Sequence, residues 1–151
     1  MTEPVSRATV EAFYRALGAQ AHERVAGFLV DDVTWTISGP IDVLPFCGTY
    51  QGKPAVLDMM KRLLPQVFDL VKFETSAMLI DGDRAATLNR LTARHIGDGR
   101  VITYRLAHFL HFRDGKIVEN LSLLDSFDAA QQVLGHALTE HEPAEGNLVA
   151  V

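Results

Sequence analysis

His108 is the residue of this chain whose type and setting point most directly to chemistry. Alternate residues of one segment are Tyr104, Leu106, His108, Leu110 and Phe112, so a single imidazole stands in an apolar row. Such alternation predicts a strand that buries one face. A buried imidazole needs a hydrogen-bond partner or a chemical role, and near pH 7 it can act as an acid or a base. His108 is therefore the first candidate for catalysis.

The partner of His108 depends on the register of the hairpin that its strand forms with the next one. A two-residue turn at Asp114 and Gly115 would place Glu119 on the inner face, among aliphatic side chains. A three-residue loop that ends at Gly115 instead pairs His108 with Asn120 and turns Glu119 toward water. We expect the second register, with Asn120 fixing the imidazole tautomer or binding a substrate oxygen. The alternative role of this pair is to hold the two strands in register.

Asp42 is a third candidate for catalysis. It lies in the loop 39–52, GPIDVLPFCGTYQG, whose prolines, glycines and large apolar residues predict a cover over a cavity. There it could serve as a mobile general base, although an aspartate in this setting is also a common turn former.

A set of apolar, aromatic and small polar residues on the predicted elements could contact a ligand or fill the core. Aromatic rings offer apolar area with a polar tip, and methionine forms pliable cavity walls. The candidates are Tyr14, Trp35, Phe46, Tyr50, Met59, Leu63, Asn89, Tyr104, Leu106, Ser122 and Leu124.

The sequence predicts neither a metal nor a cofactor. Cys47 is the only cysteine, which excludes an internal disulfide and a cysteine-based zinc site. His95 and His111 could join His108 at a metal, but His111 has the opposite strand parity to His108. The sequence has no phosphate-binding loop, dinucleotide fingerprint or nucleophile elbow.

Composition limits the partners of the protein. The chain has 151 residues, a length suited to one domain, and a net charge of -5 without a dense run of Lys or Arg. This balance argues against nucleic acid and anionic membrane as partners and leaves small neutral or weakly charged ligands open. No window reaches about 18 apolar residues, and no signal peptide precedes the first helical pattern. With its single thiol, the protein is expected in the cytoplasm.

The elements that must position these residues fall into two groups, helices first and hairpins second. Capping residues, apolar periodicity and turn signals predict helices over 6–18, 21–30, 54–64 and 126–138, and strands over 33–38, 70–80, 84–96, 101–112 and 116–124.

This order predicts an α+β domain over residues 1–138, followed by a C-terminal tail over 139–151. We expect a cone-shaped, strongly curved antiparallel sheet, with three N-terminal helices closing a hydrophobic cavity and a short C-terminal helix. Phe109, Leu121 and Leu123 make the outer sheet face more apolar than a solvated face, which predicts a homodimer through it.

Three segments carry a resemblance to a known family. They are Asp31-Asp32 followed by VTWTISGP, the sequence GTYQGKPAV that enters the third helix, and AHFLHFRDGKIVENLSLLD. In this order they resemble the SnoaL-like branch of the NTF2-like superfamily, over roughly residues 5–135. The resemblance implies a cone of bent sheet closed by helices, with a dimer through the sheet. It also implies the chemistry of ketosteroid isomerases, polyketide cyclases and limonene epoxide hydrolases, or no catalysis at all.

Most of the catalytic residues of the family's enzymes are replaced by other residue types at the matching positions of this sequence. The oxyanion-hole tyrosine of the isomerases falls on Phe13, beside Tyr14, and their second oxyanion donor falls on His108. Their general base falls near Ile37, which cannot take a proton. The acid of the cyclases falls at about Ser122. The resemblance therefore implies the scaffold without a known set of catalytic carboxylates.

Three functions remain open from the sequence. The first is a cofactor-independent isomerase, cyclase or hydrolase that uses His108 as acid/base, Asn120 and Tyr14 to orient an oxygen, and Asp42 to assist. The second is a non-catalytic module that binds or carries a small hydrophobic molecule. The third is a dimeric interaction domain with a filled core.

Overall fold

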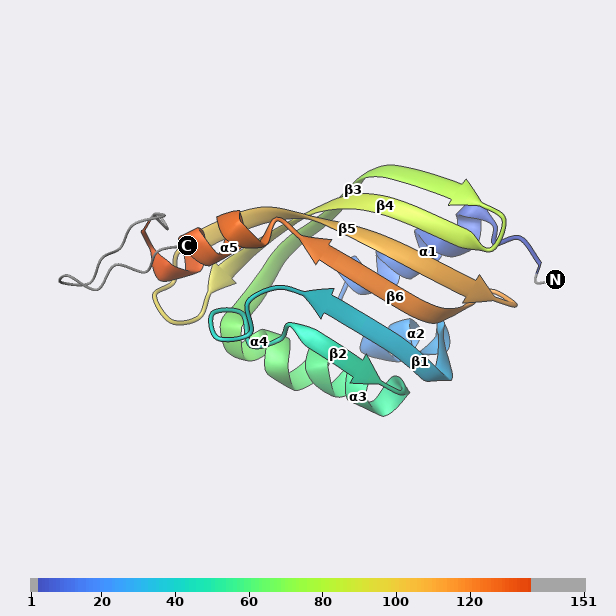
Figure 1. Cartoon of the computed structure of the whole chain (residues 1–151), viewed down its shortest axis with the longest axis horizontal. Helices are drawn as coiled ribbons and strands as arrows, with labels where there is room; N and C mark the ends of the chain where they lie inside the picture. The colour runs from blue at the N-terminus through green and yellow to red at the C-terminus, as the bar shows by residue number, and fades with distance from the viewer. Residues whose placement is uncertain (1–2, 137–151) are drawn as a thin grey trace, which may run out of the picture.

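Six strands form one curved sheet, in the order β2-β1-β6-β5-β4-β3, in the computed structural model, which describes residues 3–136 (Figure 1). The strands are β1 (Leu29–Ser38), β2 (Gly48–Gln51), β3 (Phe68–Asp81), β4 (Arg84–His95), β5 (Val101–Arg113) and β6 (Lys116–Leu124).

Helices cover the sheet in the way expected for an α+β fold. In Figure 1, α1 and α2 lie behind the sheet, α3 and α4 lie along its β1–β2 edge, and α5 follows the end of β6. The helices are α1 (Arg7–Gly18), α2 (His22–Gly27), α3 (Lys53–Asp58), α4 (Leu64–Val67) and α5 (Ser126–Leu134). The side chain of Ser6 accepts a hydrogen bond from the Thr9 amide at 3.1 Å, which confirms the predicted cap of the first helix.

The four long C-terminal strands form the predicted antiparallel meander, β3 to β6. The sheet is then completed by a pairing that the sequence did not indicate, because β1 lies parallel to β6 and β2 lies antiparallel to β1. As a result, the inner face of β6 lies between β1 and β5.

Two predicted boundaries near the N-terminus are wrong. The second helix ends at Gly27 rather than at residue 30, and β1 starts at Leu29 instead of Val33. Of the apolar stripe that suggested a longer helix, Val25 is buried by α2, Phe28 is its C-cap, and Leu29 is buried as the first residue of β1. The predicted loop 39–52 also contains a strand, β2, which pairs through Tyr50 with Trp35.

The third helical region continues through Pro65, where the sequence predicted its end. A π-helical segment, Met59–Leu63, connects α3 to α4. Pro65 then occupies an early position of α4, where its missing N–H costs no helical hydrogen bond. The wider π turn therefore lets the helix run to Val67.

The register of the last hairpin differs from the prediction in a specific way. Asp114 and Gly115 form a two-residue turn with positive φ angles of 51° and 77°, so Arg113 pairs with Lys116. A bulge between His111 and Phe112 then shifts the register by one residue. The bulge turns the residues of β6 beyond it back to the faces that we predicted, which the two-residue turn alone would have exchanged.

The bulge changes the partner of His108. In the observed register His108 lies opposite Ser122, and Asn120 lies opposite Leu110, so the predicted pair of His108 with Asn120 does not form. Both Asn120 and Ser122 nevertheless face inward, and Glu119 faces outward as expected.

The two faces of the sheet differ as predicted. Along β5, buried and accessible residues alternate without interruption, and the buried ones include the apolar row that flanks His108. On the outer face Phe109, Leu121 and Leu123 are between 38% and 50% exposed, which is high for large apolar side chains. The last helix ends at Leu134, short of the predicted residue 138, because Gly135 adopts a left-handed C-cap conformation. The tail 139–151 lies outside the described residues.

Candidate functional site

The buried polar residues of the described chain gather on three neighbouring strands. They are Thr87 and Asn89 on β4, His108 on β5, and Asn120 and Ser122 on β6. Because strands alternate their side chains, all five lie on the face that the helices cover. A polar band thus crosses an otherwise apolar interior.

A hydrogen-bond chain connects most of this band to helix α1. The Tyr14 hydroxyl lies 2.8 Å from Nδ1 of His108 and 2.5 Å from Oγ1 of Thr87. Asn89 Nδ2 donates to Thr87 Oγ1 at 3.0 Å and to the Leu106 carbonyl at 3.3 Å. Thr75 Oγ1 in turn donates to Asn89 Oδ1 at 2.8 Å. His108 is therefore held by Tyr14 and its partners, and not by Asn120.

Burial determines the charge states of His108 and Tyr14 in this hydrogen-bond chain. The low dielectric around His108 disfavours the imidazolium and lowers the pKa of His108 to about 4. Desolvation likewise raises the pKa of Tyr14 well above its usual value, against the smaller opposing effect of its hydrogen bonds. Near pH 7 the site consequently presents a neutral imidazole and a neutral phenol.

Aromatic rings surround the imidazole of His108 on several sides. Tyr14 and Phe73 lie nearly parallel to it, with ring centroids 5.8 and 6.0 Å away, and Trp35 meets it edge to face at 6.2 Å. These contacts fix the orientation of the ring in addition to the hydrogen bond at Nδ1.

His108 opens onto a cavity of about 230 Å³. This volume lies somewhat below the roughly 300 Å³ at which pockets for drug-sized ligands begin, so it suits a smaller molecule. The interior is thus not packed solid, as a domain with a filled core would require. Most of the wall is apolar and comes from β1, the third helical region and β3 to β6.

Many of the predicted contact residues line this cavity together with His108. They are Trp35, Phe46, Met59, Tyr104, Leu106, Ser122 and Leu124.

Other predicted site residues lie outside the lining, each for a structural reason. Tyr14 and Asn89 stand behind His108 in the hydrogen-bond chain. Tyr50 donates its hydroxyl proton to the Phe46 carbonyl at 2.7 Å. Leu63 is partly buried on the third helical region, whose neighbouring residue 64 faces the cavity instead.

Asp42 is exposed in the turn that follows β1, and it is not among the residues that line the cavity. This position agrees with the alternative role of Asp42 as a turn former. Its carboxylate does not contact His108.

Asn120 is enclosed beside the cavity instead of lining it. Its Nδ2 donates to Ser122 Oγ at 2.9 Å. Its Oδ1 is the one fully buried side-chain N or O atom, within the described residues, that has no hydrogen-bond partner. Asn120 therefore supports Ser122, and Ser122 is the residue that reaches the cavity.

The sequence reasoning missed several site residues. Phe73 lines the cavity and stacks on His108. Thr87 completes the hydrogen-bond chain, and its even spacing from Asn89 on one strand was the signal that both face inward. Gln20 and Asp69 are exposed members of the lining and mark its opening to solvent, with no pattern in the sequence to reveal them.

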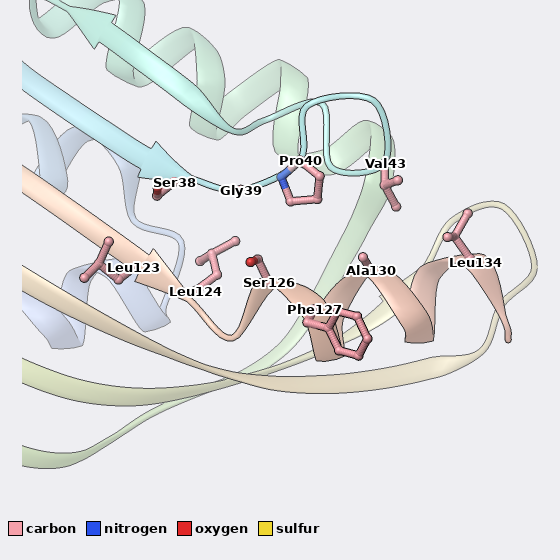
Figure 2. A pocket seen from close by; sticks show the side chains of 10 residues that line it. All are labelled: Ser38, Gly39, Pro40, Val43, Leu123, Leu124, Ser126, Phe127, Ala130 and Leu134. Atoms are coloured by element: carbon pink, nitrogen blue, oxygen red, sulfur yellow. The ribbon is translucent and has the colours of Figure 1, made fainter. Parts of the chain in front are cut away.

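A second, more open hollow lies on the other side of Leu124. Figure 2 shows this groove between two segments: the end of β1 with the loop after it, which carries Pro40 and Val43, and helix α5, which carries Phe127 and Leu134. Its volume is about 520 Å³ and its wall is mostly apolar. Leu124 lines both hollows and so forms part of the wall between them.

The described residues contain neither a metal-binding cluster nor a membrane-spanning helix. Residues 3–136 contain no cluster of three or more His, Cys, Asp or Glu side chains arranged to hold a metal ion. Nor does any helix within that range have the length and apolar character needed to cross a membrane.

Comparison with solved structures identifies the fold. The "putative isomerase" of Rhodopseudomonas palustris superimposes with a TM-score of 0.73 and 33% sequence identity, over 84% of this chain and 93% of that one. An NTF2-like protein of unknown function from Burkholderia pseudomallei gives a TM-score of 0.73 at 20% identity, with coverages of 87% and 95%. A hypothetical protein with a ketosteroid isomerase-like fold from Catenulispora acidiphila, in complex with trimethylamine, gives 0.71 at 13%, with coverages of 87% and 95%.

The fold, a curved sheet around a cavity, is thus that of the NTF2-like proteins. The model of the SnoaL-like domain family matches residues 10–120, and the chain belongs to that family. Among curated proteins, none matches this chain.

Proposed function

We propose that this protein binds a small, largely hydrophobic molecule in the cavity beside His108. The observation that carries the proposal is a cavity of about 230 Å³, open to solvent near Gln20 and Asp69, whose largely apolar wall carries His108 and Ser122 in its interior. Burial of apolar ligand surface supplies affinity, at roughly 25 cal/mol per Å², and the few polar groups orient the ligand.

The sole tryptophan of the chain provides a direct test, because Trp35 lines the cavity. We expect the bicyclic ketone 1-tetralone to change the fluorescence of Trp35 saturably. Leu106→Phe adds bulk to the wall and should abolish the response. Leu88→Phe adds the same bulk at an exposed position and should leave it intact. Equal responses of both variants, or no saturable response of the wild type, would exclude binding in the cavity.

A second candidate is catalysis, as a cofactor-independent isomerase, cyclase or hydrolase with His108 as acid/base. It is favoured by the 33% identity to the "putative isomerase" and by an imidazole that stays neutral near pH 7 and contacts the cavity. A neutral imidazole can give one proton and take another at its two nitrogens. Within the described residues no carboxylate forms a hydrogen bond with His108, and this favours binding without chemistry as the first candidate.

The variant His108→Gln separates the two candidates. Glutamine keeps a polar side chain in the cavity but cannot exchange protons near pH 7. If His108 is the catalyst, turnover of an identified substrate falls by at least about a hundredfold while ligand affinity changes little. Unchanged turnover would remove His108 from the chemistry.

We further propose that two copies associate through the outer sheet face. Phe109 and Leu121 are cross-strand partners there, and both are exposed, as is Leu123 on the same face. A second copy is the partner that would cover this apolar patch on both molecules at once.

The oligomeric state tests this proposal. Light scattering after size exclusion should give the dimer mass for the wild type and the monomer mass for Leu121→Glu. Leu79→Glu, which places the same charge at an exposed apolar position on β3, should remain dimeric. A monomeric wild type at tens of micromolar would overturn the proposal.

The cytoplasm is the compartment that we propose for the protein. Cys47 is buried, and burial raises the pKa of its thiol to about 11, so the thiol stays protonated and unpaired. Fractionation of cells that produce the natural full-length protein tests this location.

A further inference from the structure

We propose that the groove beside helix α5 holds the unbranched alkyl tail of a molecule whose ring lies in the cavity. The ligand class is then a ring compound that carries a straight, uncharged hydrocarbon chain. This inference rests on the ligand-binding function proposed above and adds a second compartment to that site.

The groove forms where two neighbouring parallel strands separate at their carboxyl ends. β1 and β6 run side by side as far as the pair of Ser38 with Leu123. Beyond that pair the chain enters loop 39–47 on one side and α5 on the other, and Figure 2 shows the two segments diverging. In open α/β sheets, ligands bind in the crevice outside the carboxyl ends of strands whose connections diverge in this way. The groove occupies the same place relative to β1 and β6.

The wall between the groove and the cavity is thin at Leu124. Among the described residues, Leu124 alone lines both spaces, and its side chain is only partly buried. It faces Gly39, which has no side chain: a Cβ there would lie 3.4 Å from Cδ1 of Leu124 and 2.6 Å from Sγ of Cys47. A change of rotamer at Leu124 is therefore the one movement that the proposal requires to join the two spaces.

The joined space suits a longer molecule than the cavity alone. The cavity has a volume of about 230 Å³, and the groove, which is open to solvent, has a volume of about 520 Å³. The first value lies below the range of roughly 300–1,000 Å³ that is typical of ligand pockets, whereas the two spaces together lie within it. The cavity thus takes the ring, and the groove has room for a chain attached to it.

The wall of the groove matches a hydrocarbon chain. Its sides carry Pro40 and Val43 on the loop and Phe127, Ala130 and Leu134 on α5 (Figure 2). None of the described residues that line it is charged, so a charged chain would find no partner there. Each CH₂ group that leaves water for this partly open groove should strengthen binding about two- to fourfold.

The mouth of the cavity is the other exit for a chain, and it is less suitable. Gln20 and Asp69 mark the mouth, and both are exposed. A hydrocarbon chain leaving there would lie in water beside a carboxylate and would bury little further apolar surface. In the groove the same chain contacts apolar side chains from two segments, which favours the passage at Leu124.

A series of alkyl phenyl ketones from acetophenone to octanophenone tests the inference, with the fluorescence of Trp35 as the signal. We expect the affinity of the wild type to rise about two- to fourfold with each added CH₂ up to octanophenone. A rise that stops after the first few members would overturn the inference, because the chain would then be limited to the cavity.

Two variants determine where the chain lies. Phe127→Asp and Leu134→Asp each introduce a charge at an exposed position that lines the groove but not the cavity, so the fold should be retained. Each should weaken octanophenone about tenfold or more and leave acetophenone unchanged. Leu79→Asp makes the same change at an exposed position on β3 and should alter neither affinity. Octanophenone affinity that both groove variants leave intact would overturn the inference.

A crystal structure with 8-bromooctanophenone locates the end of the chain directly. The anomalous signal of the bromine should lie between α5 and loop 39–47, with the Leu124 side chain turned aside. A bromine inside the cavity, or at the mouth beside Gln20, would contradict the proposed path of the chain.

The failures of the two proposals are distinguishable. No saturable response to any ketone of the series would overturn the proposed function and the groove together. Acetophenone binding without a gain from longer chains would contradict the groove alone. If Phe127→Asp separates a dimer into monomers and leaves octanophenone affinity intact, the groove is covered by a second copy and not by a ligand.

Discussion

The hydroxyl of Tyr14 lies 2.8 Å from Nδ1 of His108 and so joins helix α1 to strand β5 inside the core. The two residues are 94 positions apart in the sequence. This single contact explains how a lone imidazole is tolerated in an apolar row, because one ring nitrogen is satisfied and the other remains available.

The variant Tyr14→Phe should lower the free energy of unfolding by about 1–3 kcal/mol, because it leaves Nδ1 of His108 without a partner in the core and leaves the Thr87 hydroxyl with Asn89 alone. Urea unfolding measures the change. Tyr50→Phe is the matched control, because it removes a partly buried hydroxyl that bonds only the Phe46 carbonyl, and it should cost about 0.5–1.5 kcal/mol. A cost for Tyr14→Phe no larger than the control would contradict the buried chain.

The stability of the wild type should fall as the pH drops from about 6.5 to about 4. Burial lowers the folded-state pKa of His108 to about 4, so between these pH values the unfolded chain binds a proton that the folded chain refuses. The free energy of unfolding is therefore highest above pH 6.5, and it falls by about 3 kcal/mol in total as the pH drops toward 4.

His108→Gln supplies the reference for that pH dependence. Urea unfolding at several pH values should show that the difference between wild type and variant shrinks as the pH falls. A difference that stays constant from pH 7 to pH 4 would mean that folding leaves the pKa of His108 unchanged.

Gly39→Ala should destabilise the protein by about 1–3 kcal/mol, because a Cβ there would lie 2.6 Å from Sγ of Cys47. Cys47→Ala removes that sulfur, and the next nearest atom, Cδ1 of Leu124, is 3.4 Å away. In a double-mutant cycle the second substitution should therefore rescue most of the loss. Additive effects of the two substitutions would argue against this close contact.

Gly115→Ala should cost about 1 kcal/mol for a different reason. The φ angle of Gly115 is 77°, in the left-handed region, and a Cβ there would meet no atom within 4 Å. Backbone strain alone is then responsible, so replacing neighbouring side chains should give no rescue. Thermal unfolding measures the loss, and a neutral effect would mean that the turn differs from the two-residue form.

The sequence predicted the scaffold well because the scaffold depends on patterns that repeat. The alternation along β5 and the turn residues between the later strands each involve many residues, so the meander and its buried face follow from local rules. The parallel contact of β1 with β6 was invisible in the same patterns, because strand order depends on contacts between distant segments.

The site was harder to predict because its details depend on single residues. The same kind of pattern placed Tyr14, Asn89 and Tyr104 at a ligand, but of these only Tyr104 lines the cavity. Tyr14 and Asn89 satisfy other buried groups, a role that depends on distances across the core. The predicted partner of His108 was wrong because of one bulge at the step from His111 to Phe112. No residue type near that step indicates a bulge.

The bulge opposite His111 and Phe112 has its extra residue on β6, because these two consecutive residues pair with Ile117 and Glu119. Loss of the extra residue, Val118, would therefore keep Ser122 opposite His108. Loss of one residue between Glu119 and Ser122 would instead exchange Ser122 for Leu123 at the cavity wall. Length variation in this hairpin is thus tolerated at the bulge and excluded beyond it for as long as the cavity is in use.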